Sequence, residues 1–387
     1  MRIAVAGLGA VGLANAILLA RLHDVVALDP RPGRVAMVNR GLTPVDDPEC
    51  AEYLASGMLN LRATLCTNEA FRGAEVVIVA PPPADTETER FDTAQIEALV
   101  ERVHDTNPHA LIVIRATVPV GFTAALIEKT GCKQILVVPD FHREGRALYD
   151  NLYPARIVVG EVSTRGTMIA NLFRGAALTR DIAILQTAPT EAEAIKIFTA
   201  SYLTLRMSFF NELDTIALAA DLNVREVIET LGSDPLVGRH DDNPGFGFGG
   251  PFPARISRQV LESFGTVPQH MMRAIVDGDD ARKEALTQAI LSRRPHRVGI
   301  HRPVAGRGGD ENPDTAMRDI LVRLASCGVE LVVYEPGSHA REACGYRIET
   351  DFGRFADGCD LIVANAMTPD LAGLGPKVFT RDLFSRG

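Results

Sequence analysis

Short apolar segments alternate with longer amphipathic ones through the first third of the chain. Segments rich in Val, Ile and Leu are typical of buried strands, whereas apolar residues that recur every three to four positions predict helices. The predicted strands are Arg2–Val5, Asp24–Leu28, Val76–Ala80, Leu111–Arg115, Ile135–Val138 and Ile157–Val159. The predicted helices are Ala10–Arg21, Arg34–Arg40 and Ala94–Asp105. This alternation predicts an α/β fold in which helices cover both faces of a parallel sheet.

The middle of the chain is predicted to be helical. Thr190 and Glu193 have the spacing of a capping box, which marks the start of a helix. Helical periodicity then continues from Ala192 to about Leu222. This segment is longer than an ordinary globular helix, so we expect it to span two lobes or to form a dimer seam. A further helix is predicted over Val224–Leu231.

The strand–helix alternation resumes at Arg297 and predicts a second parallel sheet. Its predicted elements are Val298–Ile300, Thr315–Cys327, Val329–Tyr334 and Leu361–Ala364, of which the second is a helix. We therefore expect two Rossmann-like, doubly wound lobes joined by a helical central region with one long helix. The expected domains are residues 1–189 for the first lobe, 190–285 for the helical region and 286–387 for the second lobe.

A glycine-rich turn after the first strand predicts a dinucleotide site. The segment GLGAVG carries G-x-G-x-x-G between a strand and a helix, where the glycines allow a tight turn and close approach to a pyrophosphate. The helix N-terminus favours the anion. Asp29 ends the second strand and can accept from the ribose hydroxyls, which favours NAD over NADP, although the nearby Arg31 leaves NADP open. The predicted cofactor-binding residues are Gly7, Gly9, Val11, Gly12, Asp29, Arg31 and Thr117.

Composition excludes several other classes of protein. The net charge of −9 offers no basic face for nucleic acid or anionic lipid, and no apolar run approaches the length that spans a membrane. The six cysteines are scattered without a Cys-x-x-Cys pair, so neither a zinc site nor a disulfide framework is expected. We predict no metal site, a cytoplasmic location, a small-molecule substrate and no membrane or nucleic-acid partner.

Four further motifs resemble the UDP-glucose 6-dehydrogenases of the UDP-glucose/GDP-mannose dehydrogenase family. They are ATVPVG at residues 116–121, PDFHREG at 139–145, the segment 191–214 and NPGFGFGG at 243–250. The similarity runs over nearly the whole chain and includes ALYDN at 147–151 and TRDLF at 380–384. The resemblance implies an N-terminal NAD domain, a helical dimer core and a C-terminal nucleotide-sugar domain.

The resemblance also implies a reaction. Family members oxidise the C6 alcohol of a nucleotide-linked hexose twice, with two NAD, and hold the aldehyde on a cysteine that forms a thioester. A thiolate makes the aldehyde tetrahedral so that hydride can leave again. A lysine and an asparagine stabilise the oxyanion, and an acid beside the cysteine handles protons.

This chain keeps only part of the family's catalytic set. Thr117, Glu144 and Lys196 match the motif threonine, the glutamate of REG and the oxyanion lysine, and Asp140 replaces a glutamate. The cysteine position aligns with Phe252, which has no thiol. The family's asparagine becomes Ala200, and the lysine and aspartate that follow the cysteine become Arg255 and Ile256. His142 stands where leucine is usual and is either a surface histidine or a replacement base.

Positions on the substrate side have also changed. The predicted substrate-binding residues are Asn243, Gly249, Arg255 and His142. In the family motifs, a tyrosine, a serine and an arginine correspond to Asp241, Gly245 and Leu236. The acids Asp241 and Asp242 would repel a diphosphate unless they face away. In the C-terminal lobe, a lysine and an arginine of the family correspond to Gly306 and Pro313, with Arg302 and Arg307 close by.

Three functions remain open from the sequence. The first is a single, cysteine-free hydride transfer from a nucleotide-linked sugar or a related phosphorylated alcohol, in which Thr117, Glu144 and Lys196 position the alcohol and manage its proton. The second is an NAD-binding pseudoenzyme that serves as a sensor or partner. The third is oxidation to the uronate with another group in place of the cysteine. In each case a homodimer through the long helix is expected.

Overall fold

The computed structural model describes residues 1–82, 91–248, 251–302, 315–336, 342–343 and 345–384, and for residues 251–254, 315 and 342–343 it describes the backbone alone. The described residues form two compact units. Met1–Thr199 makes up the N-terminal unit, and the described residues from Ala200 onward make up the C-terminal unit. None of the described helices combines the length and apolarity that crossing a bilayer requires.

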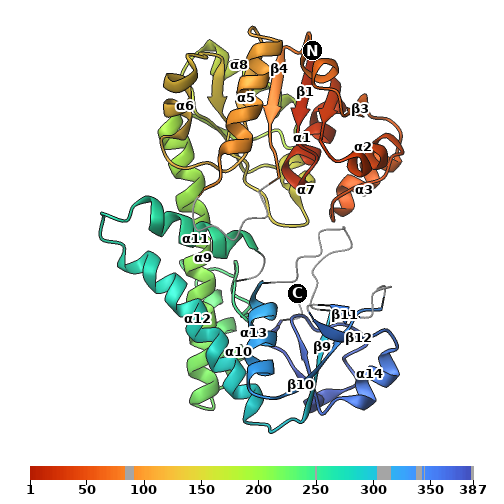
Figure 1. Cartoon of the computed structure of the whole chain (residues 1–387). Helices are drawn as coiled ribbons and strands as arrows, with labels where there is room; N and C mark the ends of the chain where they lie inside the picture. Colours follow the sequence, from red (N-terminus) through yellow and green to blue (C-terminus); the bar gives the residue numbers. More distant parts are fainter. Residues whose placement is uncertain (83–90, 249–250, 303–314, 337–341, 344, 385–387) are drawn as a thin grey trace. The chain divides into compact units, whose positions relative to one another are not determined.

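A six-stranded sheet forms the centre of the N-terminal unit (Figure 1). From one edge to the other, its strands are β3 (Leu61–Thr64), β2 (Asp24–Leu28), β1 (Arg2–Ala6), β4 (Val76–Val79), β5 (Leu111–Ile114) and β6 (Ile135–Val137). All five pairings are parallel. The order 3-2-1-4-5-6 is that of a dinucleotide-binding sheet, which places ligands at the carboxyl ends of the strands.

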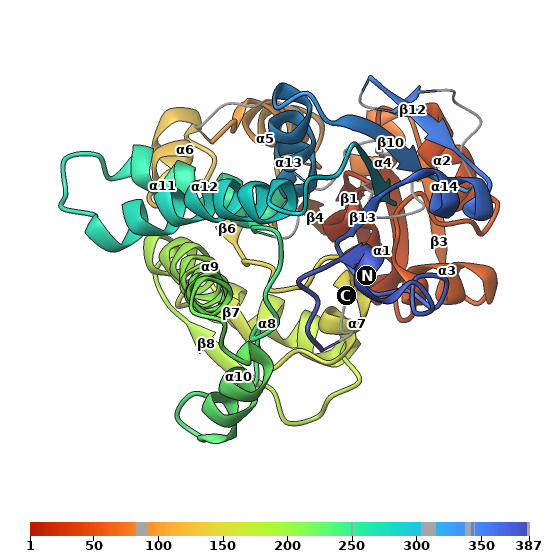
Figure 2. The ribbon, with the colours of Figure 1, turned by 90° about the horizontal axis from the view of Figure 1, so that it is seen from below.

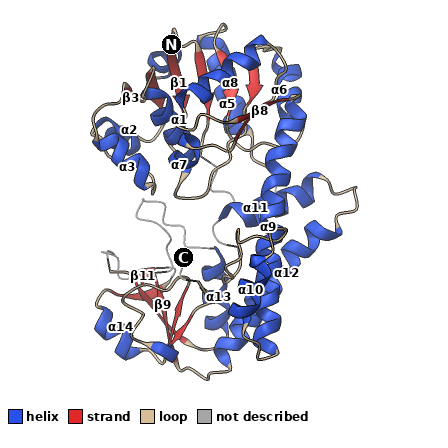
Figure 3. Cartoon of the chain, turned by 180° about the vertical axis from the view of Figure 1, so that it is seen from behind, coloured by secondary structure: helices blue, strands red, loops and turns tan. Residues whose placement is uncertain are grey.

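Helices cover both faces of this sheet because successive strand residues point to opposite sides (Figure 3). The helices that pack on one face are α1 (Ala10–Ala20), α2 (Pro32–Asn39), α3 (Pro48–Ala55), α7 (Ala147–Leu152) and α8 (Thr164–Ala176). Those on the other face are α4 (Thr67–Phe71), α5 (Ala94–Thr106), α6 (Phe122–Thr130) and the start of α9 (Pro189–Ala219). A separate parallel pair, β7 (Arg156–Val159) and β8 (Ala183–Gln186), leads into α9.

The C-terminal unit has a second six-stranded sheet. In spatial order its strands are β11 (Glu342–Ala343), β12 (Tyr346–Glu349), β10 (Glu330–Tyr334), β9 (Arg297–His301), β13 (Leu361–Ala364) and β14 (Val378–Phe379). Every pairing is parallel except that of β11 with β12. The apolar residues of α12 (His270–Leu291) and α13 (Thr315–Ser326) pack on one face, and those of α14 (Phe352–Gly358) pack on the other.

The 31-residue helix α9 continues from one unit into the next. Within the C-terminal unit, α10 (Val224–Ser233) and α12 lie on either side of its second half, as Figure 2 shows with α9 seen nearly along its axis. Phe210 and Ala217 of α9 pack against Val224 and Ile228 of α10 in a small apolar cluster. The remaining helix of this unit, α11 (Pro251–Ser263), packs along α12.

Most predicted elements occur within one to three residues of their expected bounds, and the predicted pair of parallel sheets is confirmed. The capping box is wrong. Helix α9 begins at Pro189, so Thr190 lies inside the first turn. The carboxylate of Glu193 instead accepts from the backbone N–H of Gly121 at 2.6 Å and of Thr123 at 2.8 Å, which caps the start of α6. Glu193 therefore binds the start of α6 and not the first turn of its own helix.

Candidate active site

The glycine-rich turn has a geometry that only glycine allows. Gly7 follows β1 with a φ of +109°, and a Cβ there would lie 2.3 Å from the carbonyl oxygen of Ala80. A Cβ on Gly12 would lie 2.0 Å from the carbonyl oxygen of Gly7. Helix α1 begins at Ala10 with Gly9 as its N-cap, and no side chain caps it. The free N–H groups therefore remain available for a pyrophosphate, so these residues fit a dinucleotide.

Asp29 connects this turn to the end of β2. Its side chain is 1% exposed. One carboxylate oxygen accepts from the backbone N–H of Leu8 at 2.8 Å, and the other accepts from that of Arg31 at 2.9 Å. Each oxygen keeps a second lone pair for a ribose hydroxyl. Arg31 itself is exposed, and Arg34 lies 4.0 Å from the same carboxylate. Val11, in the first turn of α1, is half-buried against the core.

A buried ion pair lies where β5 and β6 end. Arg115 follows β5 and donates to the Oδ1 of Asp140, which follows β6, at 2.7 Å. The two side chains are only 6% and 4% exposed. Arg115 also donates to Asn151 of α7 at 2.7 Å and to the carbonyl of Val138 at 3.2 Å. These contacts fix the position of the Asp140 carboxylate.

His142 and Lys196 extend this polar cluster. The Nδ1 of His142 lies 2.9 Å from the Oδ2 of Asp140. Lys196 comes from the N-terminal part of α9, is 8% exposed, and has its Nζ 5.6 Å from the ring centre of Phe141. The guanidinium of Arg156 lies 4.4 Å from the same ring centre. The cluster therefore combines four permanent or potential cations, Arg115, His142, Arg156 and Lys196, with a single carboxylate.

Burial and charge shift the pKa values of Asp140 and Lys196 in this cluster. Burial alone would raise the pKa of Asp140, but Arg115, His142 and Lys196 outweigh it and hold that pKa well below its usual range. Burial lowers the pKa of Lys196 to about 8. The charge of Asp140 acts against this shift, and the charges of Arg115 and Arg156 add to it. Asp140 therefore remains ionised at neutral pH, while Lys196 can change its charge close to neutrality.

A small cavity of about 30 Å³ adjoins the ion pair. Its lining includes Arg115, Asp140, Phe141, Asn151 and Arg156. This volume holds a water-sized group. Among the described residues, no group of three or more His, Cys, Asp or Glu side chains is arranged to hold a metal ion.

The structure does not bring every predicted catalytic residue into this cluster. Asp140, His142 and Lys196 come together, since His142 lies 2.9 Å from Asp140 and Lys196 acts electrostatically on the same carboxylate. Thr117 is half-buried in the loop between β5 and α6. Glu144 is exposed in the turn before α7.

The predicted substrate residues of the C-terminal unit have varied surroundings. Asn243 uses its amide within the protein, donating to Asp382 at 2.7 Å and accepting from the backbone N–H of Leu383 at 3.0 Å. Arg255 is half-buried in α11, and Leu236 is 95% exposed. Asp242 is buried and lies 3.3 Å from Arg239, whereas Asp241 is exposed. Gly249, Gly306, Arg307, Pro313 and the side chain of Phe252 lie outside the described residues.

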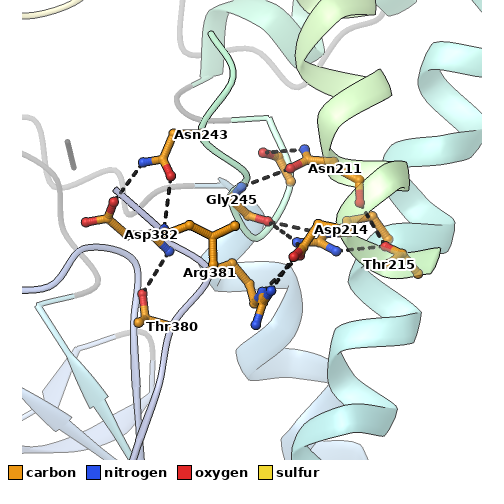
Figure 4. Close-up of polar contacts among 11 residues, drawn as sticks. Asn211, Asp214, Thr215, Asn243, Gly245, Thr380, Arg381 and Asp382 are labelled. Carbon is orange, nitrogen blue, oxygen red and sulfur yellow. Dashed lines mark hydrogen bonds and ion pairs between the residues drawn. The ribbon is translucent and has the colours of Figure 1, made fainter. Parts of the chain in front are cut away.

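A second buried ion network fixes the loop that contains Asn243 (Figure 4). Arg282 of α12 pairs with Asp214 of α9 at 2.5 Å and donates to the carbonyl of Gly245 at 2.9 Å. Asn211 accepts from the N–H of Gly245 at 2.9 Å. Arg381 donates to the same Asp214 at 2.9 Å. The glycine-rich loop is thus held by α9, α12 and the segment after β14.

None of the described cysteines of the N-terminal unit belongs to its polar cluster. Cys50, Cys132 and Cys359 are buried in apolar cores, and burial raises the pKa of the Cys50 and Cys359 thiols. Cys66 and Cys327 are exposed. Cys344 lies outside the described residues. The raised pKa makes the thiols of Cys50 and Cys359 poorly suited to act as nucleophiles.

Several residues that shape the site were missed in the sequence. Arg115 was assigned only to the end of a strand, and Asn151 only to the ALYDN motif, yet both hold Asp140. A charged residue at the carboxyl end of a predicted parallel strand was a usable signal for Arg115. Glu193 binds a residue 70 positions away, and Arg282 binds residues 37 or more positions away. The local sequence carries no signal for such contacts.

The sheet order, the glycine turn and the ion cluster at the ends of β5 and β6 define a dinucleotide-dependent dehydrogenase. Comparison with known proteins agrees. Residues 1–176 match the NAD binding domain of the UDP-glucose/GDP-mannose dehydrogenase family, and residues 190–277 match its central domain. The chain belongs to this family, whose NAD-binding domain it carries.

Relatives match along the full length of the chain. It is 37% identical over 393 residues to the UDP-glucose 6-dehydrogenase of Streptococcus pneumoniae, covering 100% of both chains. It is 33% identical to that of Campylobacter jejuni, covering 99% of each. A UDP-glucose dehydrogenase structure from Pyrobaculum islandicum superposes with a TM-score of 0.86 at 24% identity, covering 100% of this chain and 94% of that one. The last comparison supports the fold.

Proposed function

We propose that this protein oxidises the alcohol of a nucleotide-linked sugar, or of a related phosphorylated substrate, in one cysteine-free hydride transfer to NAD. The observation that carries the proposal is the buried cluster of Asp140, His142 and Lys196 at the carboxyl end of the NAD-binding sheet. A two-electron oxidation needs an aligned hydride, a proton acceptor and a group that stabilises the alcohol oxygen. None of these is a covalent nucleophile.

In this proposal Lys196 holds the oxygen of the alcohol. It is nearly buried, and the cations Arg115 and Arg156 add to the positive potential around it. A preorganised positive charge favours the negative charge that develops on oxygen as the C–H bond breaks. Bound NAD would supply the hydride acceptor. Thr117 and Glu144 remain predictions for positioning the substrate.

The sequence argues against the second oxidation of the family reaction. Phe252 replaces the cysteine and Ala200 replaces the oxyanion asparagine. Losing one oxyanion donor typically lowers a rate by about 10²–10³. The same substitutions also favour the second candidate, a pseudoenzyme that binds NAD and serves as the partner of an active dehydrogenase.

The variant Phe252→Cys separates these possibilities. We expect the wild-type protein to release an aldehyde from UDP-glucose and the F252C variant to do the same, because Ala200, Arg255 and Ile256 still differ from the family set. Uronate from F252C alone would show that a competent four-electron pocket remains. Tight NAD binding by both proteins, with no product from a panel of nucleotide sugars, would favour the pseudoenzyme. Phe252→Ala is the matched control for the loss of the ring.

The proposal includes a homodimer that forms through α9. Four large apolar residues on this helix, Phe198, Tyr202, Phe209 and Ile216, are 49 to 60% exposed. Their spacing of four, seven and seven positions places them on one side of a helix. Sedimentation of the wild type and of a Tyr202→Glu, Phe209→Glu variant would test this, with a monomeric variant expected.

We also propose a cytoplasmic location, which the unpaired described cysteines support.

A further inference from the structure

The loop after β6 contains a carboxylate–imidazole pair. Asp140 and His142 are two positions apart, and the Nδ1 of His142 lies 2.9 Å from the Oδ2 of Asp140. The pair lies where ligands bind to a parallel sheet of this kind, at the carboxyl ends of its strands. Lys196, the proposed ligand of the alcohol oxygen, acts electrostatically on the same carboxylate.

Asp140 is poorly suited to accept a proton itself. Its Oδ1 accepts from Arg115 at 2.7 Å, and its Oδ2 faces His142. Its pKa is held well below the usual range by these neighbours, although burial acts in the opposite direction. A carboxylate that remains ionised orients an adjacent imidazole and stabilises its cation, and does not take the proton.

The same contact favours one tautomer of His142. If Nδ1 carried no proton, its partial negative charge would lie 2.9 Å from an oxygen of an ionised carboxylate, which is repulsive. A proton on Nδ1 makes the contact attractive, although its angle lies outside hydrogen-bond geometry in this structure, and leaves Nε2 as the acceptor. Nδ1 is buried while the side chain is 20% exposed, so the exposed part of the ring lies on its other atoms.

We infer that the Nε2 of His142, oriented by Asp140, takes the hydroxyl proton of the substrate during oxidation. This inference rests on the proposed hydride transfer. The C–H bond breaks with its electron pair moving to NAD, the O–H bond breaks with its proton moving to Nε2, and the C–O single bond becomes a carbonyl. The resulting imidazolium then releases its proton to solvent. Asp140 is thereby a positioning residue and His142 the base.

The charged groups around the pair suit this role. Asp140 stabilises the imidazolium, while Arg115 at the end of β5, Arg156 of β7 and Lys196 of α9 keep the surroundings from becoming negative overall. A base beside an ammonium group that binds the alcohol oxygen can remove the proton as the oxygen becomes negative. The family that this chain resembles usually has leucine at the position of His142. The chain that lacks the cysteine therefore carries a base that the family pattern does not include.

The kinetic test compares His142→Gln with His109→Gln. His109 is exposed just before β5, at the amino edge of the same sheet, so H109Q controls for the same chemical change away from the site. With NAD and UDP-glucose we expect H142Q to lower kcat by about 10²–10⁴. Added imidazole should partly restore turnover. The affinity for NAD should not change in either variant. An H142Q protein that binds NAD and loses less than threefold in kcat would overturn the inference.

A second measurement does not depend on turnover. Nitrogen-15 spectra of protein labelled at its nine histidines, with His142 assigned by its absence in H142Q, report which ring nitrogen carries the proton. We expect the neutral ring to be protonated on Nδ1. A proton on Nε2 would overturn the inference whether or not the protein oxidises UDP-glucose. Absence of turnover in the wild type, together with an Nδ1–H ring, would contradict the proposed function and not the pair itself.

Discussion

Arg381 and Asp214 form an ion pair across 167 positions of the chain (Figure 4). Asp214 is fully buried on α9 and is held on its other side by Arg282 of α12. Arg282 also donates to Thr215 and to the carbonyl of Gly245, so it joins the helices to the glycine-rich loop. The segment after β14 therefore takes part in holding a loop that the sequence assigns to substrate binding.

This relationship predicts an order of stability among variants. Arg282→Met should lower the free energy of unfolding of the C-terminal unit by about 3–5 kcal/mol, because Arg282 is the more buried of the two arginines and also donates to Thr215 and to the carbonyl of Gly245. Arg381→Met should cost less, about 1–3 kcal/mol, since Arg282 still neutralises Asp214. Urea titration followed by circular dichroism measures both. Equal losses, or a larger loss in R381M, would contradict the greater contribution assigned to Arg282.

The ion pair between Arg115 and Asp140 predicts acid-dependent stability. Asp140 has a lowered pKa in the folded protein, so its contribution is present above the unfolded value of about 4 and is lost as the pH falls below it. Asp140→Asn should destabilise the N-terminal unit by about 3–5 kcal/mol at pH 7, because Arg115 is left buried and unpaired. The difference from wild type should shrink toward pH 3. The surface variant Glu97→Gln is the control, and a D140N protein as stable as E97Q at pH 7 would argue against the ion pair.

The charge of Lys196 should determine how activity changes at alkaline pH. If its ammonium group holds the alcohol oxygen, kcat/KM should fall as the pH rises through about 8, the lowered pKa that burial produces. Lys196→Met should reduce kcat by about 10²–10³. Lys196→Arg should abolish the alkaline limb, because a guanidinium stays charged. A rate that instead rises through pH 8 would mean that neutral Lys196 is the base.

The lowered pKa of Lys196 also affects stability. Burial of the charged ammonium group lowers the free energy of unfolding. This loss of stability is absent above the ordinary pKa of 10.5, grows as the pH falls toward about 8, and is constant below that. Unfolding titrations of the wild type and of K196M between pH 7 and 11 should therefore converge at high pH. A gap that does not change with pH would show that folding leaves the pKa of Lys196 at its ordinary value.

The glycine turn predicts a sharp difference between two identical substitutions. Gly12→Ala places a Cβ 2.0 Å from the carbonyl oxygen of Gly7 and should weaken NAD binding tenfold or more, since backbone must move. Gly33→Ala in α2 meets nothing within 4 Å, so NAD affinity should be unchanged and stability should rise by about 0.5–1 kcal/mol. Calorimetric titration with NAD measures the comparison, and equal affinities in the two variants would exclude a tight pyrophosphate turn.

Much of the fold could be predicted because its strands are short, apolar and regularly spaced. The strand Asp24–Leu28 was predicted with its observed bounds, and so was Leu361–Ala364. The capping box failed because Glu193 bonds a helix 70 positions earlier in the chain. The two-residue strand β11 and the strand β8 were not predicted. The strand Ile157–Val159 was predicted and forms β7, but it pairs with β8 outside the six-stranded sheet, which a local pattern does not reveal. The division into three domains stays a prediction.

The site was predicted less completely than the fold. The glycine turn is local, and its residues were found from spacing alone. The cluster at Asp140 combines the ends of two strands with residues of α7 and α9. Asp140 and Lys196 were predicted as catalytic, and His142 as a substrate-binding residue or a replacement base. Arg115 and the orientation of His142 depend on three-dimensional neighbours, and became visible only in the folded chain.

The central claim is that one hydride is transferred without a covalent intermediate, and it is tested most directly by counting NADH formed per UDP-glucose consumed while the product is identified by mass spectrometry. We predict one NADH per sugar and an aldehyde product. Two NADH per sugar and a glucuronate product would contradict the claim, because a second oxidation would then proceed with Phe252 in place of the cysteine.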